Sequence, residues 1–357
     1  MNSFHSSTQY TNWIKTKKEL QGITNSKIEK IFKRFNDVNK LIKQENEEKV
    51  IKNKIMNKEN SKENFQKYIS LKNFFLKVET EKLLLINYSN KLIQSLNSQP
   101  EQSTNLKNNT ITYFRRFFLK KSILDYNANL LMAGAFRLAS KVASLNFSQN
   151  DYIKIFPFLA NSWVKLNEYE FYLCYILDYE FYVYNPYQAL LGLIYTLEQK
   201  GFFLTQDKEN YINQDDLKSE CMKIIDKMYL TDIIFLYTYS EIALASLFIQ
   251  CEFKNINISN IAEYLDLDKL LNYKDFINNQ VEDMKKLIEE IPKYETEKEE
   301  NIKIKEIEKN IRNFLENFPQ YKNKLKDERK KLKMKMEDFE NTFIPFEEKL
   351  NPKNQKK

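Results

Sequence analysis

Apolar residues recur every three or four positions through most of this chain, which is the spacing of one face of an α-helix. The pattern is present in residues 10–35, where Ile, Leu and Phe follow Trp13, and it returns from about Leu71 onwards. Further helices are predicted at residues 83–93, 109–126, 129–142, 163–184, 187–201, 213–230, 240–251 and 273–290. The chain is therefore predicted to be all-α.

Two of the predicted helices carry small residues on several sides. Residues 129–142 contain Ala133, Gly134, Ala135, Ala139 and Ser140, and residues 240–251 contain Ala243, Ala245 and Ser246. Small side chains let neighbouring helices approach closely, so each segment is predicted to be the central helix of a bundle. The occurrence of two such helices, about 110 residues apart, favours an internal duplication.

Breaks in the helical pattern suggest how the chain is divided. Asn185-Pro186 is the predicted joint between two bundles, because the residue before a proline avoids the α region. Residues 36–64 are rich in Lys, Asn and Glu, which predicts a low-complexity insert that is disordered or a frayed helix. We expect an N-terminal helix plus insert at 1–69, bundles at 70–184 and 185–292, and a charged helical tail at 293–357.

Composition narrows the possible functions. The chain has 4 Gly and 7 Pro in 357 residues, which argues against a β-rich or α/β fold and against Gly-rich phosphate loops. The one histidine is His5, near the terminus, so catalytic triads, HExxH zinc sites and the kinase HRD loop lack a required residue. No catalytic residue, cofactor or metal site is predicted.

Cysteine usage and hydropathy indicate an intracellular protein outside the membrane. Cys174, Cys221 and Cys251 are widely spaced in apolar surroundings, which predicts buried, reduced thiols. The most apolar stretch, residues 233–249, contains Glu241 and is short for a membrane span, so it is predicted to be a core helix. The N-terminus lacks the apolar segment of a secretory signal.

Charge is distributed unevenly along the chain. The net charge is +14 over residues 1–162, −11 over residues 163–292 and +4 over residues 293–357, which gives +7 in total. A nucleic-acid clamp would need basic residues on both bundles, so the acidic second bundle argues against direct contact with nucleic acid. The basic first part suits a negatively charged partner.

Several segments together resemble the cyclin family, and within it the cyclin H group. YFRRFFLKKSILDY (113–126) resembles the second helix of the first cyclin box, and FRLASKV (136–142) the end of its third helix. EYEFYLCYILDYEFYVYNPY (168–187) resembles the fifth helix and the entry to the second box. MYLTDIIFLYTYSEIALASL (228–247) is the most specific segment, and Trp13 before a basic helix also fits this group.

The resemblance implies tandem five-helix cyclin boxes flanked by N- and C-terminal helices. It also implies a regulatory subunit with no enzymatic activity of its own, which binds and activates a cyclin-dependent kinase 7-like kinase. A RING-bearing assembly factor of the CDK-activating kinase would be the third component. Such complexes act in cell-cycle control and, within general transcription factor H, in transcription by RNA polymerase II. The expected location is the nucleus, with the cytoplasm as a second compartment.

The family's kinase-binding positions can be carried onto this sequence one by one. The lysine at the end of the third helix corresponds to Lys141 and the glutamate of the fifth helix to Glu170. The resemblance implies apolar kinase contacts at Val142, Cys174, Tyr179 and Phe181. From the residues alone, Lys141 and Glu170 could equally be a surface ion pair or unrelated exposed charges, and the apolar four could be ordinary core.

Other readings of the sequence remain open. Arg115 and Arg116 could bind a phosphate or pair with acidic neighbours, and pairing is the favoured interpretation. A DNA-binding protein of the transcription factor B type shares the twin five-helix boxes, but it would need an N-terminal zinc ribbon and a basic second box. A kinase-independent scaffold with cyclin folds is the third alternative.

Overall fold

The computed structural model describes residues 7–52, 78–98, 103–204, 213–267, 273–293, 297–317 and 319–342. Within these ranges the regular structure is helical and contains no strand, which confirms the predicted all-α class. The chain forms two compact units, one of residues 1–27 and 78–304 and the other of residues 28–77 and 305–357.

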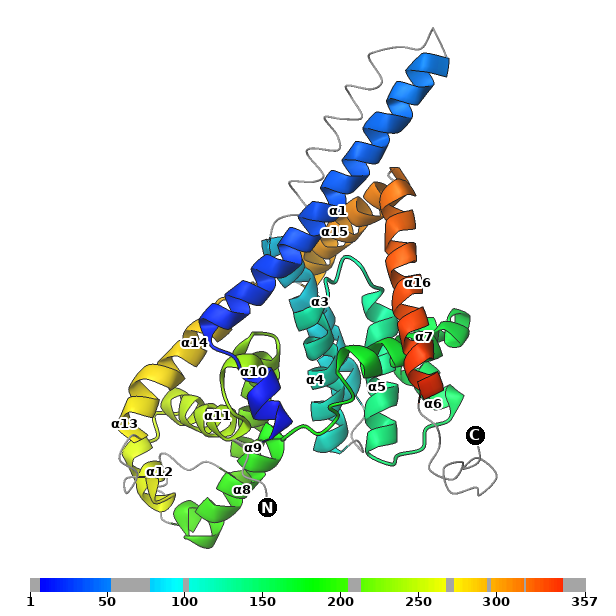
Figure 1. Ribbon diagram of the computed structural model, residues 1–357. Coiled ribbons are helices and arrows are strands. Elements are labelled where there is room, and N and C mark those ends of the chain that lie inside the picture. The colour runs from blue at the N-terminus through cyan, green and yellow to red at the C-terminus, as the bar shows by residue number, and fades with distance from the viewer. Residues whose placement is uncertain are drawn as a thin grey trace, which may run out of the picture. The chain divides into compact units, whose positions relative to one another are not determined.

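The first bundle is built around α5. Over the described residues it consists of α3 (Val78–Asn97), α4 (Thr104–Lys120), α5 (Ala128–Val142), α6 (Gln149–Ile155) and α7 (Trp163–Ile176), with a 3-10 turn at Pro157–Asn161. Helix α5 packs against both α4 and α7 (Figure 1). Ala133, Ala135 and Ala139 are completely buried, as expected for the central helix.

The second bundle repeats this arrangement around α11. It comprises α8 (Pro186–Gln199), α9 (Gln214–Tyr229), α10 (Ile233–Leu236), α11 (Tyr239–Phe253), α12 (Ile258–Tyr264) and the consecutive helices α13 (Tyr273–Asp275), η6 (Phe276–Val281) and α14 (Glu282–Glu289). Helix α11 packs against α8 and α9, and its Ala243 and Ala245 are completely buried. Each bundle therefore has the predicted small-residue helix at its centre.

Short polar side chains start most helices of the two bundles. A side-chain oxygen accepts a hydrogen bond from a free backbone N–H of the first turn at Ser103, Asn127, Ser148, Asn185, Asn213, Thr238 and Asn257. Such caps satisfy donors that have no partner inside the helix. They explain why a chain with so few Gly and Pro still has well-defined helix starts.

The joint between the bundles begins earlier than the sequence predicts. Helix α7 ends at Ile176, and not at Asn185, because Asp178 and Tyr179 adopt left-handed backbone angles (φ 53° and 59°). The N–H of Tyr179 donates to the carbonyl of Cys174 at 3.0 Å, which closes the helix end. Residues 180–185 then run without regular structure until Asn185 caps α8, whose first residue is Pro186.

The N-terminal region also differs from the prediction of one helix over residues 10–35. A π-helical turn, η2 (Gln9–Trp13), is followed by extended Ile14, whose neighbour Lys15 donates its N–H to the Phe235 carbonyl at 2.6 Å. Helix α1 (Lys17–Lys52) then starts, so residues 36–52 of the predicted insert are helical. Residues 53–64 of that insert lie outside the described residues.

The second unit combines residues 28–52 of α1 with the C-terminal helices. These are residues 305–317 of α15 (Glu297–Asn317) and all of α16 (Pro319–Thr342), and both lie within the predicted tail of residues 293–357. Arg34 donates to both carboxylate oxygens of Glu328, at 3.1 and 2.7 Å, and to the Tyr321 hydroxyl at 3.1 Å. A guanidinium that engages a carboxylate with two bonds fixes the relative register of α1 and α16.

Candidate functional site

A glycine brings α5 and α7 close together at the predicted site. A Cβ atom added at Gly134 would lie 3.3 Å from a side-chain carbon of Leu173 and 3.4 Å from the backbone nitrogen of Glu170. The first distance is tighter than ordinary van der Waals contact and the second is at its lower limit, so a larger residue would require the end of the Leu173 side chain to move. The absence of a side chain at Gly134 thus favours a close approach of α5 and α7.

Lys141 and Glu170 form an ion pair across the two helices. The Lys141 Nζ donates to Glu170 Oε1 at 2.6 Å. Only 11% of the Glu170 side chain is exposed, whereas 56% of the Lys141 side chain is. The structure thus excludes the reading as unrelated charges, and it leaves Lys141 accessible to a partner.

Arg137 is a second cation on the same carboxylate, and it was not singled out from the sequence. Its Nε lies 3.2 Å from Glu170 Oε2, so each carboxylate oxygen has its own basic partner. Its guanidinium also donates to Asn167 and lies over the Trp163 ring. Arg137 precedes Lys141 by four positions, the spacing of one helix face, and that is the signal in the sequence that points to it.

The predicted apolar contacts differ in their exposure. Val142 and Tyr179 are exposed, whereas Cys174 and Phe181 are half-buried. Tyr179 packs edge-to-face on Phe181, and Phe181 in turn packs on Tyr113, whose hydroxyl donates to the Phe181 carbonyl at 2.6 Å. Fully buried core is therefore excluded for all four residues.

Cys174 links the ion pair to this aromatic group. Burial raises the pKa of its thiol to about 11, and the Glu170 carboxylate contributes to the increase while Lys141 opposes it. Burial likewise raises the pKa of the Tyr113 hydroxyl, with a smaller contribution from Cys174. The effect of Glu170 on this thiol agrees with the sequence, in which Cys174 lies one helical turn beyond Glu170 on α7.

Phe171 adds to this surface and was missed. It lies on α7 next to Glu170, and about half of its side chain is exposed. Leu145, just beyond the end of α5, is also exposed. Large apolar side chains that stay exposed around a charged pair are typical of a protein–protein contact. We refer to Lys141, Val142, Glu170, Phe171, Cys174, Tyr179 and Phe181 as the α5–α7 face.

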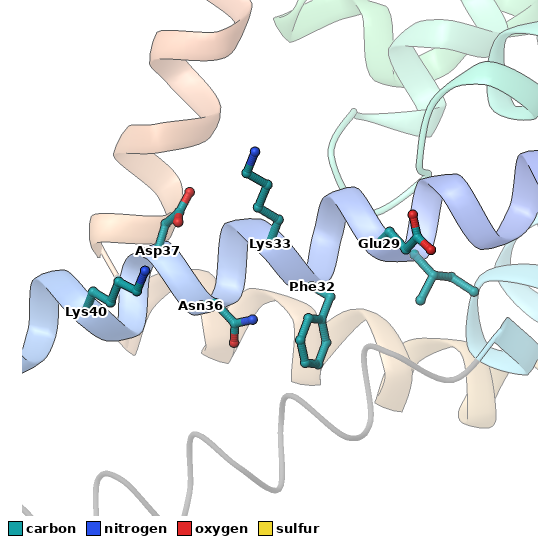
Figure 2. Close-up of a pocket in the computed structure, with 7 residues that line it drawn as sticks. Glu29, Phe32, Lys33, Asn36, Asp37 and Lys40 are labelled. Carbon is teal, nitrogen blue, oxygen red and sulfur yellow. The ribbon is translucent and has the colours of Figure 1, made fainter.

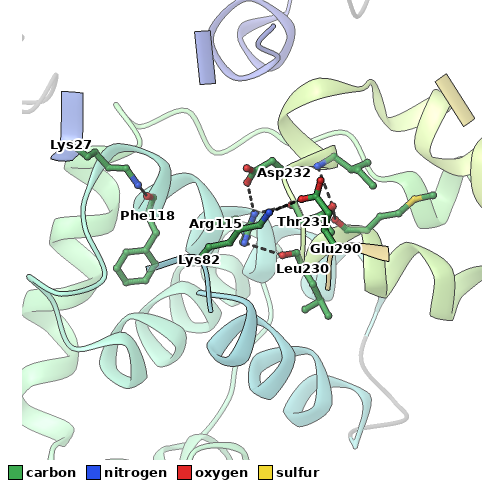
Figure 3. Close-up of polar contacts among 10 residues, drawn as sticks. Lys27, Lys82, Arg115, Phe118, Leu230, Thr231, Asp232 and Glu290 are labelled. Atoms are coloured by element: carbon green, nitrogen blue, oxygen red, sulfur yellow. Dashed lines mark hydrogen bonds and ion pairs between the residues drawn. The ribbon is translucent and has the colours of Figure 1, made fainter. Parts of the chain in front are cut away.

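Arg115 pairs with an acidic neighbour, as the favoured interpretation predicted, whereas the partners of Arg116 are a backbone carbonyl and an aromatic ring. Arg115 donates to the carbonyl of Thr231 at 2.7 Å, to that of Leu230 at 3.4 Å and to the Asp232 carboxylate at 2.9 Å (Figure 3). Arg116 donates to the Glu180 carbonyl at 3.3 Å and stacks on Trp13. Both side chains are buried, so neither is available to a phosphate group.

A hollow along α1 lies outside this face. Figure 2 shows a hollow along α1, lined by Ile28, Glu29, Phe32, Lys33, Asn36, Asp37 and Lys40. All of these residues come from one helix, and Asp37 already pairs with Lys324, so we assign no ligand to it. Among the described residues no group of His, Cys, Asp and Glu could hold a metal ion, and no described helix could cross a membrane.

Comparisons with known proteins agree with the twin-bundle architecture. Residues 185–293 match the cyclin C-terminal domain family. Cyclin mcs2 of Schizosaccharomyces pombe is 25% identical over 245 residues, which cover 69% of this chain and 68% of that protein. Cyclin-H of Xenopus laevis is 23% identical over 235 residues, which cover 64% of this chain and 70% of that protein. Matches to two relatives from Saccharomyces cerevisiae cover 42% of those proteins.

A solved structure shares the fold over most of its length. A chain of the CAK complex of Chaetomium thermophilum, bound to ATP-γ-S, aligns with a TM-score of 0.63 and 19% sequence identity. The alignment covers 87% of this chain and 88% of that chain. The domain match, the sequence relatives and the shared fold lead to one conclusion, which is that residues 185–293 form a cyclin C-terminal domain and that the chain is similar to cyclins of the cyclin H group.

Proposed function

We propose that this chain is the regulatory subunit of a cyclin-dependent kinase 7-like kinase and has no phosphotransferase activity of its own. The observation that carries the proposal is the α5–α7 face, where Lys141 and Glu170 pair beside exposed apolar side chains. The likeness to Cyclin-H and to a chain of a CAK complex supports the choice of kinase.

The face has the chemistry that a kinase helix would require. Its apolar residues, Val142, Phe171, Tyr179 and Phe181, would cover the apolar side of the kinase C-helix. When water leaves such a contact, backbone carbonyls and polar side chains of the partner need new hydrogen bonds. Lys141 can donate and Glu170 can accept. Docking would hold the C-helix where its glutamate pairs with the β3 lysine of the active kinase.

The proposal includes a third subunit and a cellular role. A RING-bearing assembly factor would join the cyclin and the kinase, as the yeast TFIIK complex of Kin28, Ccl1 and Tfb3 contains three components. The substrates would be the activation loops of other cyclin-dependent kinases and the tail of RNA polymerase II. The nucleus is the proposed location, with the cytoplasm as a second compartment.

The first prediction tests the kinase contact directly. Replacing Lys141 and Glu170 together by Ala should weaken binding to the kinase by at least about thirtyfold, since loss of a desolvated charge contact costs roughly 2–5 kcal/mol. Kinase activation should fall in parallel, while the far-UV circular dichroism stays unchanged. Binding is measured by titration against the purified kinase, and activity by phosphorylation of a tail peptide.

A matched control is available on the second bundle. Lys223 and Glu220 form a similar surface ion pair on α9, with nitrogen and oxygen 2.6 Å apart. Their double replacement by Ala should leave kinase binding unchanged. Equal affinity of the Lys141/Glu170 variant and the wild type would contradict the proposed contact, and ATP hydrolysis by the pure chain would contradict the regulatory role.

The two alternative functions predict different results. A DNA-binding factor of the transcription factor B type should shift duplex DNA in a salt-dependent manner, although the −11 charge of residues 163–292 disfavours it. A kinase-independent scaffold should purify from native extract without any kinase, which mass spectrometry of the co-purified proteins would reveal.

A further inference from the structure

Docking of a partner would change the charge balance around the Glu170 carboxylate. The carboxylate is mostly buried already, and a docked helix would remove its remaining water. A buried carboxylate without a partner is strongly destabilising. If Lys141 turned toward the kinase, Glu170 would lose the cation at 2.6 Å.

The two cations around Glu170 are held very differently. Arg137 contacts three residues of α7, namely Trp163, Asn167 and Glu170, and 21% of its side chain is exposed. Lys141 pairs with Glu170 and is more than half exposed. The lysine side chain is flexible with three donors, whereas the planar guanidinium is locked by each further contact.

We propose that Arg137 is a positioning residue that keeps Glu170 neutralised and thereby allows Lys141 to donate to the kinase. This inference rests on the proposed function. In the free protein Glu170 is shared between two cations, and in the complex Arg137 alone balances it. Arg137 therefore acts through Glu170 and Lys141, without contacting the kinase itself.

Gly134 places the arginine for this role. Gly134, Arg137 and Lys141 succeed one another at helical spacing on the side of α5 that contacts α7. Arg137 and Lys141 follow Gly134 by one and two turns, and both reach the same carboxylate, at 3.2 and 2.6 Å. A cyclin with an apolar residue at the position of Arg137 would have to hold its glutamate with the lysine alone.

The test is a set of variants that separates positioning from direct contact. Arg137→Met keeps the apolar stem and removes the charge, and it should weaken kinase binding roughly tenfold. Glu170→Gln removes the need for balance, so adding Arg137→Met to Glu170→Gln should change affinity less than about threefold. Arg137→Lys, which keeps the charge but loses the fixed guanidinium, should bind more tightly than Arg137→Met and more weakly than the wild type.

Thermal unfolding of each free variant accompanies the binding titrations. If Arg137→Met weakens kinase binding as much in the Glu170→Gln background as in the wild type, the inference is overturned. Such a result would mean that Arg137 contacts the kinase directly or only stabilises the fold. If Arg137→Met fails to fold, Arg137→Lys is compared with and without Glu170→Gln instead, and a loss of equal size in both backgrounds excludes charge balance. Failure of the wild type to bind any such kinase would instead refute the proposed function, and the inference with it.

Discussion

Cys174 is a residue-scale reporter of the α5–α7 face. It is half-buried, whereas Cys221 and Cys251 are buried in the second bundle, so an alkylating reagent should reach Cys174 first. Burial raises its pKa to about 11, with a further contribution from Glu170. Because the raised pKa keeps the thiol protonated at neutral pH, only a small fraction is present as the reactive thiolate.

The second prediction concerns the pH dependence of this alkylation. The rate at Cys174 should rise about tenfold for each pH unit between 8 and 10, since the thiolate fraction grows by that factor well below the pKa. An ordinary thiol with a pKa near 8.5 would level off above about pH 9. Iodoacetamide labelling followed by peptide mass spectrometry gives the rate at each pH.

Two controls connect the labelling to structure and to function. Glu170→Gln removes a negative neighbour, so it should lower the pKa of Cys174 and speed labelling at pH 8. Saturating kinase should protect Cys174 if the partner covers the face. A rate that levels off near pH 9 would show that the thiol is not buried as described, and unchanged labelling in the complex would place the kinase elsewhere.

At the scale of elements, several helices end without glycine. Ser144 follows α5 and Asn255 follows α11, both in the left-handed region with φ of 56°. Leu145 donates its N–H to the Ser140 carbonyl, and Ile256 donates to that of Cys251, each at 2.8 Å. This six-residue closure normally uses glycine at the left-handed position. Helix α8 ends in the usual way, because the left-handed residue that follows it is Gly201 (φ 78°).

These endings explain which parts of the fold could be predicted. The central helices α5 and α11 were identified correctly, because their small residues among large apolar ones form a local pattern within each helix sequence. The end of α7 was misplaced, because Asp178 and Tyr179 carry no obvious stop signal. The break after Trp13 was missed for a similar reason, since it depends on the distant Phe235 carbonyl.

The candidate site shows the same limit. Lys141 and Glu170 came from the resemblance to a family, and their pairing became visible only when α5 and α7 were placed together. Arg137 and Phe171 were missed because periodicity tells which residues share a helix face, and not which helix that face meets. Contacts between elements therefore required the structure.

The third prediction tests the glycine-free helix ends. Ser144→Gly should raise the free energy of unfolding by about 0.5–1 kcal/mol, because the left-handed angle costs a side chain more than glycine gains in the unfolded chain. Gly201→Ala should lower it by a similar amount for the opposite reason. Urea unfolding followed by circular dichroism measures both. If both substitutions changed the free energy of unfolding by the same amount and in the same direction, the left-handed backbone angles would not determine stability at these helix ends.

At the scale of the molecule, polar contacts join the two bundles. Lys107 of α4 pairs with Asp226 of α9 at 2.6 Å, and the Tyr187 hydroxyl of α8 donates to the same carboxylate at 2.6 Å. Asn185, the cap of α8, donates to Asn105 of α4 at 2.7 Å. The kinase contact proposed for α5 and α7 lies on the first bundle. The polar contacts between the bundles therefore determine whether the second bundle moves with the first as one rigid body.

Arg115 is the contact at this junction that a single substitution can test. Its guanidinium is buried and satisfies the carbonyls of Leu230 and Thr231, whereas its carboxylate partner Asp232 is 55% exposed. The fourth prediction is that Arg115→Met lowers the free energy of unfolding by about 2–4 kcal/mol, because it leaves buried carbonyls without donors. Asp232→Asn should cost less than Arg115→Met, because Asp232 is half exposed and the oxygen of an Asn amide can still accept from the Arg115 guanidinium.

Fluorescence of the junction can follow this loss. The chain has two tryptophans, and Trp13 stacks on Arg116, the neighbour of Arg115, while Trp163 belongs to α7. In a Trp163→Phe background, Trp13 reports on the junction alone. Arg115→Met should then move the fluorescence transition to lower urea than the circular dichroism transition, because the junction opens before the helices melt. The fluorescence and circular dichroism transitions could instead coincide, with equally small shifts of the urea midpoint for Arg115→Met and Asp232→Asn. That result would mean that apolar packing holds the bundles together and that Arg115 contributes only the apolar part of its side chain.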